Sequence, residues 1–180
     1  MTVQEFINKV EEISPIKETY FQNKNRIMPQ VIADSYIIKE RDSTKDNFNQ
    51  KNDIIRDLIE KFQSEKITFG DYSFVKNEIT QKGDLNIFCY SSHSFLAYKN
   101  ASSEIIEYDN DSNNLNILEY CAKDSVSFLQ ATLCLLEMYA LRLQGSIHRN
   151  DMEKNSIFLD KCITKAGGQK YTGFFKSIIF

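Results

Sequence analysis

Short apolar runs separated by polar turns fill the middle of the chain, and one long apolar segment follows them. Residues 85–90, 94–99, 104–109 and 115–120 have the apolar and aromatic composition of β-strands. From about Asp124 to Leu143 the apolar positions cover more than one side of a helix, which is typical of a central, buried element. The pattern predicts an antiparallel meander covered by a long helix.

The N-terminal part has helical spacing of apolar residues. Thr2 and Glu5 have the spacing of a capping box, and the helix that they begin ends at about Ser14, before Pro15. Pro29 suits the first turn of a second helix, which we expect to continue through Tyr36 and Ile38, because proline lacks an N–H that is unpaired there anyway.

A polar stretch, 40–52, interrupts this helical region, and we expect it to form a mobile loop. Asp53 then has the position of an N-cap for a further helix with an apolar stripe. The β region begins at Lys66, where apolar residues alternate around Gly70–Asp71. This dipeptide predicts a tight hairpin turn or a bulge.

The C-terminal part predicts another helix and a docked tail. The helix begins at Asn150 or Asp151, ends at Ala166-Gly167-Gly168, and is expected to turn four apolar residues inward: Ile157, Phe158, Cys162 and Ile163. The tail, 171–180, is too apolar to stay in water, so we expect it to pack on the body or on another subunit. Either a monomer or a homodimer is compatible with this pattern.

The length of 180 residues predicts one domain. Its fold class is α+β: N-terminal helices with a polar insert over 1–65, a mostly antiparallel meander sheet over 66–120, and C-terminal helices over 121–180.

Charge and the distribution of apolar residues indicate which partners and which cellular compartment we expect. The net charge of −3 argues against nucleic acid as the main partner, because phosphate contacts need clustered Lys and Arg. The N-terminus lacks a basic region followed by an apolar run, so we expect no signal peptide. The apolar segment 126–143 is interrupted by Gln130, Glu137 and Arg142, so we expect no membrane span. We therefore expect a cytoplasmic location.

The four cysteines, Cys89, Cys121, Cys134 and Cys162, are widely spaced and form no CxxC pair. We interpret them as free, mostly buried thiols. The run Asp109–Asn110–Asp111 resembles the start of an EF-hand loop, but Asn114 and Tyr120 stand where that loop needs Gly and Glu. The sequence therefore predicts neither a metal nor a cofactor site.

Candidate catalytic residues are few. His93 follows Ser91 and Ser92 between two strands, so a small site using Cys89, Ser92 or His93 is conceivable. Neighbours on a strand point to opposite faces, which favours an ordinary polar hairpin residue over a catalytic histidine. The sequence favours a protein that is not an enzyme.

The order of several loose motifs resembles the SUKH superfamily over about residues 27–136. The motifs are Ile27-Met28-Pro29, the Gly-containing segment 67–74, the strand 83–88, the segment 103–109 that leads into an acidic turn, and the helix entry 122–129. The absence of Trp, the polar insert 40–52 and the C-terminal extension depart from that family's pattern.

The resemblance implies a mixed sheet packed on helices and a non-catalytic binding role. Bacterial members of that family are commonly immunity proteins, which neutralise a cognate toxin of a polymorphic toxin system. Acidic residues would steer a basic nuclease-type toxin domain and aromatic residues would anchor it. The candidate contact residues lie at the turns and around the meander: Asp71, Tyr72, Tyr90, His93, Tyr98, Tyr108, Asp109 and Asp111.

Two other functions stay open at this point. One is a housekeeping interaction module that binds a cellular partner and protects against no toxin. The other is a small enzyme using Cys89 or His93, which requires a reactive, accessible thiol. A buried Cys89 would count against that enzyme.

Overall fold

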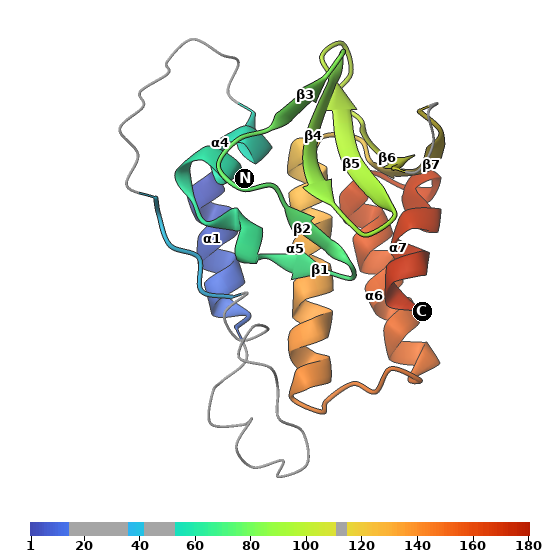
Figure 1. The fold of residues 1–180 in the computed structure, drawn as a ribbon. Coiled ribbons are helices and arrows are strands. Elements are labelled where there is room, and N and C mark those ends of the chain that lie inside the picture. The colour runs from blue at the N-terminus through green and yellow to red at the C-terminus, as the bar shows by residue number, and fades with distance from the viewer. Residues whose placement is uncertain (15–35, 42–52, 111–114) are drawn as a thin grey trace.

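A curled antiparallel sheet lies against a layer of helices in the computed structural model (Figure 1), which confirms the predicted α+β class. The structure describes residues 1–14, 36–41, 53–110 and 115–180. The strand order is β1-β2-β4-β5-β6-β7, and β3 also pairs with β4. The strands are β1 Thr68–Phe69, β2 Tyr72–Phe74, β3 Thr80–Lys82, β4 Leu85–Tyr90, β5 Ser94–Lys99, β6 Ile105–Asp109 and β7 Ile117–Ala122.

Four of the described helices begin at residues whose side chains cap them. In α1 the Thr2 hydroxyl and the Glu5 carboxylate form the expected capping box, and carboxylates of Asp53, Asp124 and Asp151 cap the three following helices. The helices are α1 Val3–Glu12, α4 Ile54–Lys61, α5 Ser125–Leu143, α6 Met152–Ala166 and α7 Thr172–Ile179, with short 3-10 turns at Ser64–Lys66 and Gln169–Tyr171.

Helix α5 is the centre of the core. Figure 1 shows it between α1 and α6, and it contacts both of these helices as well as α4 and β1. Phe128 packs edge-on against Phe69 and Phe88, with ring centroids 5.8 and 5.3 Å apart. By length and composition α5 could span a membrane, and half of its apolar window is buried inside the fold.

Two Gly-Asp dipeptides make the tight hairpin turns. Gly70 (φ +59°) and Gly83 (φ +63°) both adopt the left-handed region that glycine tolerates best. The first turn joins β1 to β2, so the predicted hairpin is confirmed there and no bulge is present. A Cβ at Gly70 would lie 3.3 Å from Ile178 of α7, whereas a Cβ at Gly83 would meet nothing within 4 Å.

The sheet buries side chains on both faces. One face packs on the helices through residues such as Phe88, Leu96 and Ile105. The opposite face holds a smaller cluster that consists of Leu85, Ile87, Phe95, Ala97, Ile106 and Tyr108. Burial on both faces explains why β4, β5 and β6 read as nearly continuous apolar runs rather than as strict alternations.

The helix predicted to continue through Tyr36 and Ile38 is not present in the part of it that the structure describes. Residues 36–40 are not helical; the backbone there runs beside the end of α4, where Gln63 N–H donates to Lys39 O (2.9 Å) and Arg41 N–H to Lys61 O (2.7 Å). Tyr36 is buried, and its hydroxyl donates to Leu136 O (2.9 Å). These long-range contacts outweigh the local helical pattern. The helix start at Pro29 and most of the loop 40–52 lie outside the described residues.

Three further predictions need correction. The last strand is Ile117–Ala122, not 115–120, because Ala122 and Tyr120 pair with β6. The strand β3 was not predicted, since all three of its residues are polar and exposed at the edge of β4. Ile157 is 50% exposed rather than inward-facing. The tail does pack on the body, where Ile179 is buried.

Candidate functional site

A cavity of about 630 Å³ opens where the sheet meets the C-terminal helix. Its walls come from the β1–β2 hairpin, the β4–β5 turn, β6, the end of α5, the loop after α5, and α7. We call it the polar cavity, and its charged and polar lining includes Asp71, Tyr72, His93, Glu107, Arg142 and Arg149. Its volume is in the usual range of about 300–1,000 Å³ for ligand pockets.

A hydrogen-bond network lines the sheet side of the polar cavity. The Tyr72 hydroxyl donates to Glu107 Oε1 (2.5 Å) and lies 2.9 Å from Ser94 Oγ. Ser94 Oγ lies in turn 2.9 Å from Ser91 Oγ. Glu107 is only 9% exposed and Tyr72 only 8%. Burial, and then the hydrogen bond to Glu107, raise the pKa of Tyr72, so the phenol stays a neutral donor.

The helical side of the polar cavity carries a guanidinium. Arg142 Nη2 donates to Asn155 Oδ1 (2.8 Å) and to Ile179 O (2.9 Å), which ties the end of α5 to α6 and α7. Burial lowers the pKa of Arg142. Next to it, the Tyr139 hydroxyl accepts a hydrogen bond from the Gly70 N–H (3.1 Å), which fixes the β1–β2 turn against α5.

Three of the sequence-predicted contact residues meet at the polar cavity: Asp71, Tyr72 and His93. Asp71 and His93 are exposed on the two turns, and Tyr72 is buried below them. The cavity therefore combines an exposed aspartate and an exposed histidine with a buried aromatic wall, beside the exposed Arg149. Asp111 lies outside the described residues.

The other candidates lie elsewhere. Tyr98 is on the helix-facing side of β5 beside Asp53 and Arg56, and burial raises its pKa. Tyr108 is 3% exposed and stacks on Phe95 on the opposite face, with ring centroids 5.6 Å apart.

The last two described candidates are at strand ends: Tyr90 ends β4, and Asp109 ends β6 next to Ser94, which lines the polar cavity. Tyr90 packs against the cluster on the opposite face of the sheet. Asp109 pairs with Ser94, and its N–H donates to Asn116 O (3.0 Å). The predicted contact residues thus do not share one surface.

Sequence reasoning missed Glu107, Arg142 and Arg149. Glu107 shares a strand face with Ile105, so a charged residue on the buried face of a strand was the available signal. Arg142 is the one basic residue in the mostly apolar helix α5, which is the corresponding signal there. Arg149 belongs to a polar loop, and nothing in the sequence distinguishes it there.

The thiols do not form an exposed reactive centre with His93. Cys89 is 0% exposed, pairs with Phe74 across the sheet, and has its pKa raised by burial. Burial also raises the pKa of Cys121. His93 and Ser92 are exposed in the β4–β5 turn, outside the core that encloses Cys89. A hydrogen bond from Cys162 lowers the pKa of the half-buried Cys134, on the distant helix α5.

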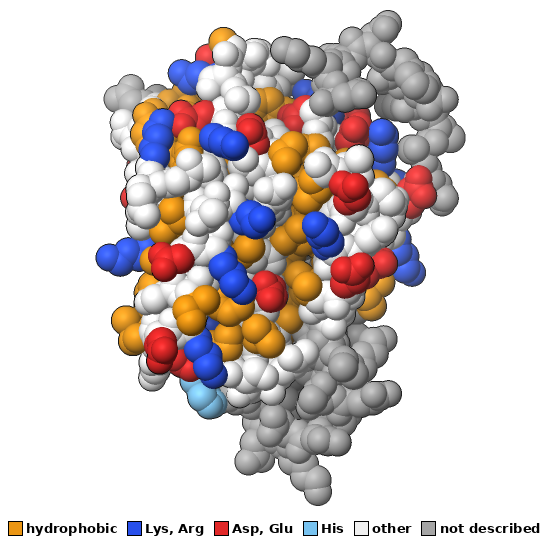
Figure 2. All heavy atoms as spheres, turned by 180° about the vertical axis from the view of Figure 1, so that it is seen from behind, with side chains coloured by type: hydrophobic (Ala, Val, Ile, Leu, Met, Phe, Trp, Pro, Cys, Tyr) orange, Lys and Arg blue, Asp and Glu red, His pale blue; other side chains and the backbone are white. Residues whose placement is uncertain are grey.

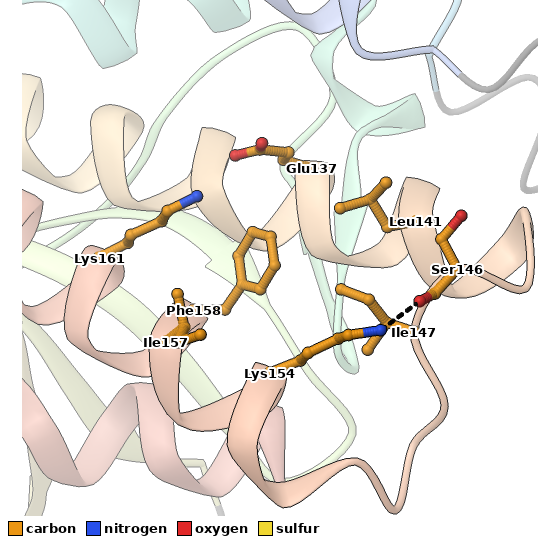
Figure 3. A pocket seen from close by; sticks show the side chains of 8 residues that line it. All are labelled: Glu137, Leu141, Ser146, Ile147, Lys154, Ile157, Phe158 and Lys161. Carbon is orange, nitrogen blue, oxygen red and sulfur yellow. Dashed lines mark hydrogen bonds between the residues drawn. The ribbon is translucent and has the colours of Figure 1, made fainter.

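A second hollow of about 340 Å³ lies between α5 and α6. Figure 3 shows Phe158 pointing into it, Glu137 and Leu141 from α5, and the Lys154 ammonium donating to Ser146 O (2.9 Å). We call it the α5–α6 groove. Figure 2 shows the back of the molecule, where basic and acidic side chains are interspersed among hydrophobic ones.

Within the described residues, no group of three or more His, Cys, Asp or Glu side chains could hold a metal ion. Comparison with protein-family models, curated proteins and solved structures finds no match to this chain.

Proposed function

We propose that this chain is a non-catalytic protein-binding protein, and that it acts as an immunity protein that neutralises a cognate bacterial toxin. The resemblance to the SUKH superfamily suggested this function, and the polar cavity is the observation that supports it best. Its rim consists of two turns that hydrogen bonds hold in place, so a partner would meet a surface that is already formed.

One acidic group on the rim and the net charge of the chain favour a basic partner such as a nuclease-type toxin domain. Asp71 is exposed at the tip of the first hairpin, and the chain carries a net charge of −3. Acidic groups at the edge of a binding surface speed the encounter with a basic protein. Tyrosines such as Tyr72 and Tyr139 add rigid aromatic walls, which are common in binding sites.

The enzyme alternative has less support. It relied on a reactive Cys89, and that thiol is buried with a raised pKa. The housekeeping module shares the same binding chemistry, and only the identity of the partner separates it from an immunity protein.

Affinity capture from the source cells tests the proposal. The tagged chain should retain one stoichiometric partner, a toxin with a basic C-terminal domain, and co-expression of the chain should protect cells that express this domain. Capture of ordinary cellular proteins without protection would favour the housekeeping module. Absence of any partner from cells that express both proteins would contradict protein binding.

Two Gly-Asp hairpin turns provide a matched pair of variants. Asp71→Lys reverses a charge on the rim of the polar cavity, and Asp84→Lys makes the same change in the second turn, where Lys82 pairs with Leu85. Both aspartates are exposed, so both variants should fold. We expect Asp71→Lys to lose the partner and Asp84→Lys to retain it. Equal retention by both variants would exclude this rim as the contact surface.

A further inference from the structure

Glu107 is a buried carboxylate that lines a cavity and has no ion-pair partner in the described part of the chain. No Lys, Arg or His in that part lies within 4.0 Å of its oxygens. Its Oε1 accepts a hydrogen bond from the Tyr72 hydroxyl, which is neutral. Buried carboxylates are usually paired or coordinate a cation, because removing a charge from water is costly.

The nearby guanidiniums do not pair directly with Glu107 among the described residues. Arg142 is held by Asn155 Oδ1 and Ile179 O, and Arg149 is exposed on the loop after α5. Both line the polar cavity, but neither forms an ion pair with Glu107. The carboxylate therefore lines the cavity without a direct cationic partner in the described part of the chain, and an incoming cation could pair with it there.

The walls of the polar cavity suit a cation on an apolar stem. Tyr36, Tyr72 and Tyr139 contribute aromatic surface, and Leu143 and Ile178 contribute aliphatic surface. Aromatic faces attract ammonium and guanidinium groups, and an alkyl stem packs well on apolar walls. Asp71 lies at the exposed rim, where a basic group would first approach.

We propose that the polar cavity receives a lysine or arginine side chain of a protein partner and pairs its cationic group with Glu107. The identity of the partner as a protein rests on the proposed function. The cationic chemistry does not, because it follows from Glu107, Asp71 and the aromatic and aliphatic parts of the cavity wall.

Small probes test the cationic chemistry without any partner. We would titrate the full chain with n-butylammonium, n-butanol and butyrate, which share a short alkyl stem and carry positive, zero and negative charge. Two-dimensional NMR would report binding. The expected result is saturable binding of n-butylammonium, at least tenfold tighter than butanol or butyrate, with nuclear Overhauser contacts from its methylene protons to Tyr72.

The variant Glu107→Gln keeps the shape of the side chain and removes its charge. It should weaken n-butylammonium binding at least tenfold, whereas Glu104→Gln, on the same segment but bonded to Lys170, should change it less than twofold. If Glu107→Gln does not fold, the contacts to Tyr72 in the wild-type chain decide the question. Binding of butanol or butyrate as tight as that of n-butylammonium, or contacts far from Tyr72, would overturn the proposal.

Experiments with a captured partner distinguish the cationic site at Glu107 from the protein-binding function. Binding of n-butylammonium at Glu107 with no protein partner would retain the cationic site and reject the protein-binding function. A partner whose affinity is unchanged by Glu107→Gln would retain the function and reject the site.

Discussion

The variant Tyr72→Phe removes the hydroxyl that holds the buried Glu107 carboxylate. The ring stays, so its packing against Phe69 and Phe174, each with centroids 5.6 Å away, is preserved and no cavity is created. What is lost is a hydrogen bond to a carboxylate at 2.5 Å and a contact with Ser94 Oγ at 2.9 Å. Hydrogen bonds to charged groups are worth about 1.5–3 kcal/mol, so we expect the free energy of unfolding to fall by about 2 kcal/mol.

Urea unfolding followed by circular dichroism measures this loss. The midpoint should fall with an unchanged slope, and the melting temperature should fall by roughly 4–8 °C for a chain of this size. Tyr90→Phe is the matched control, since Tyr90 is half-buried on the same sheet and its hydroxyl makes no hydrogen bond within the described residues. It should cost less than about 0.5 kcal/mol.

A double-mutant cycle with Glu107→Gln assigns the loss to the pair. The coupling energy between the Tyr72 and Glu107 changes should be about 1 kcal/mol or more, because the two groups are in direct contact. Equal losses for Tyr72→Phe and Tyr90→Phe, or purely additive effects of Tyr72→Phe and Glu107→Gln, would refute the network described here.

Three further predictions address the turns, the thiols and the phenols. Gly70→Ala and Gly83→Ala both place alanine at a positive φ, at a cost of about 1–2 kcal/mol each. Only Gly70→Ala also crowds α7, so in urea unfolding it should destabilise the chain by about 1 kcal/mol more than Gly83→Ala. Equal effects of the two variants would contradict the contact with α7. A disulfide-exchange reagent should modify Cys134 in the folded chain and leave Cys89 unmodified, because burial keeps the Cys89 thiol protonated and inaccessible. Rapid labelling of Cys89 would support the enzyme alternative. Folding raises the pKa of Tyr72, so the contribution of this residue to stability should be fully present below about pH 10 and be lost as the pH rises above it. Urea midpoints between about pH 8 and 11.5 should therefore fall less in Tyr72→Phe than in the wild-type chain. An equal fall in both chains would contradict the raised pKa.

The sequence predicted well those helix caps and turns that depend only on residues close together along the chain. The sequence marked the capping box at Thr2, the cap at Asp53 and the turn at Gly70, because each of them depends on residues within a few positions along the chain. Tyr36 was mispredicted because its environment is set by a carbonyl one hundred residues away in sequence, at Leu136. Strand β3 was missed because pairing with β4, and not burial, defines it.

The candidate site was predicted only in part for the same reason. Asp71 and His93 stand on turns, and the sequence marks turns well. The buried half of the polar cavity depends on which side chains face each other across the fold. Glu107 reaches Tyr72 because both lie on the helix-facing side of the sheet, while Tyr108, one residue later, lies on the opposite face.

Hydrogen–deuterium exchange of the chain, alone and saturated with its captured partner, tests most directly that the polar cavity is the binding surface. The account predicts slower exchange in peptides that cover residues 68–74 and 90–95, the two turns of the rim, and no change in α6. Slower exchange confined to α6, beside the α5–α6 groove, with unchanged turns, would contradict it.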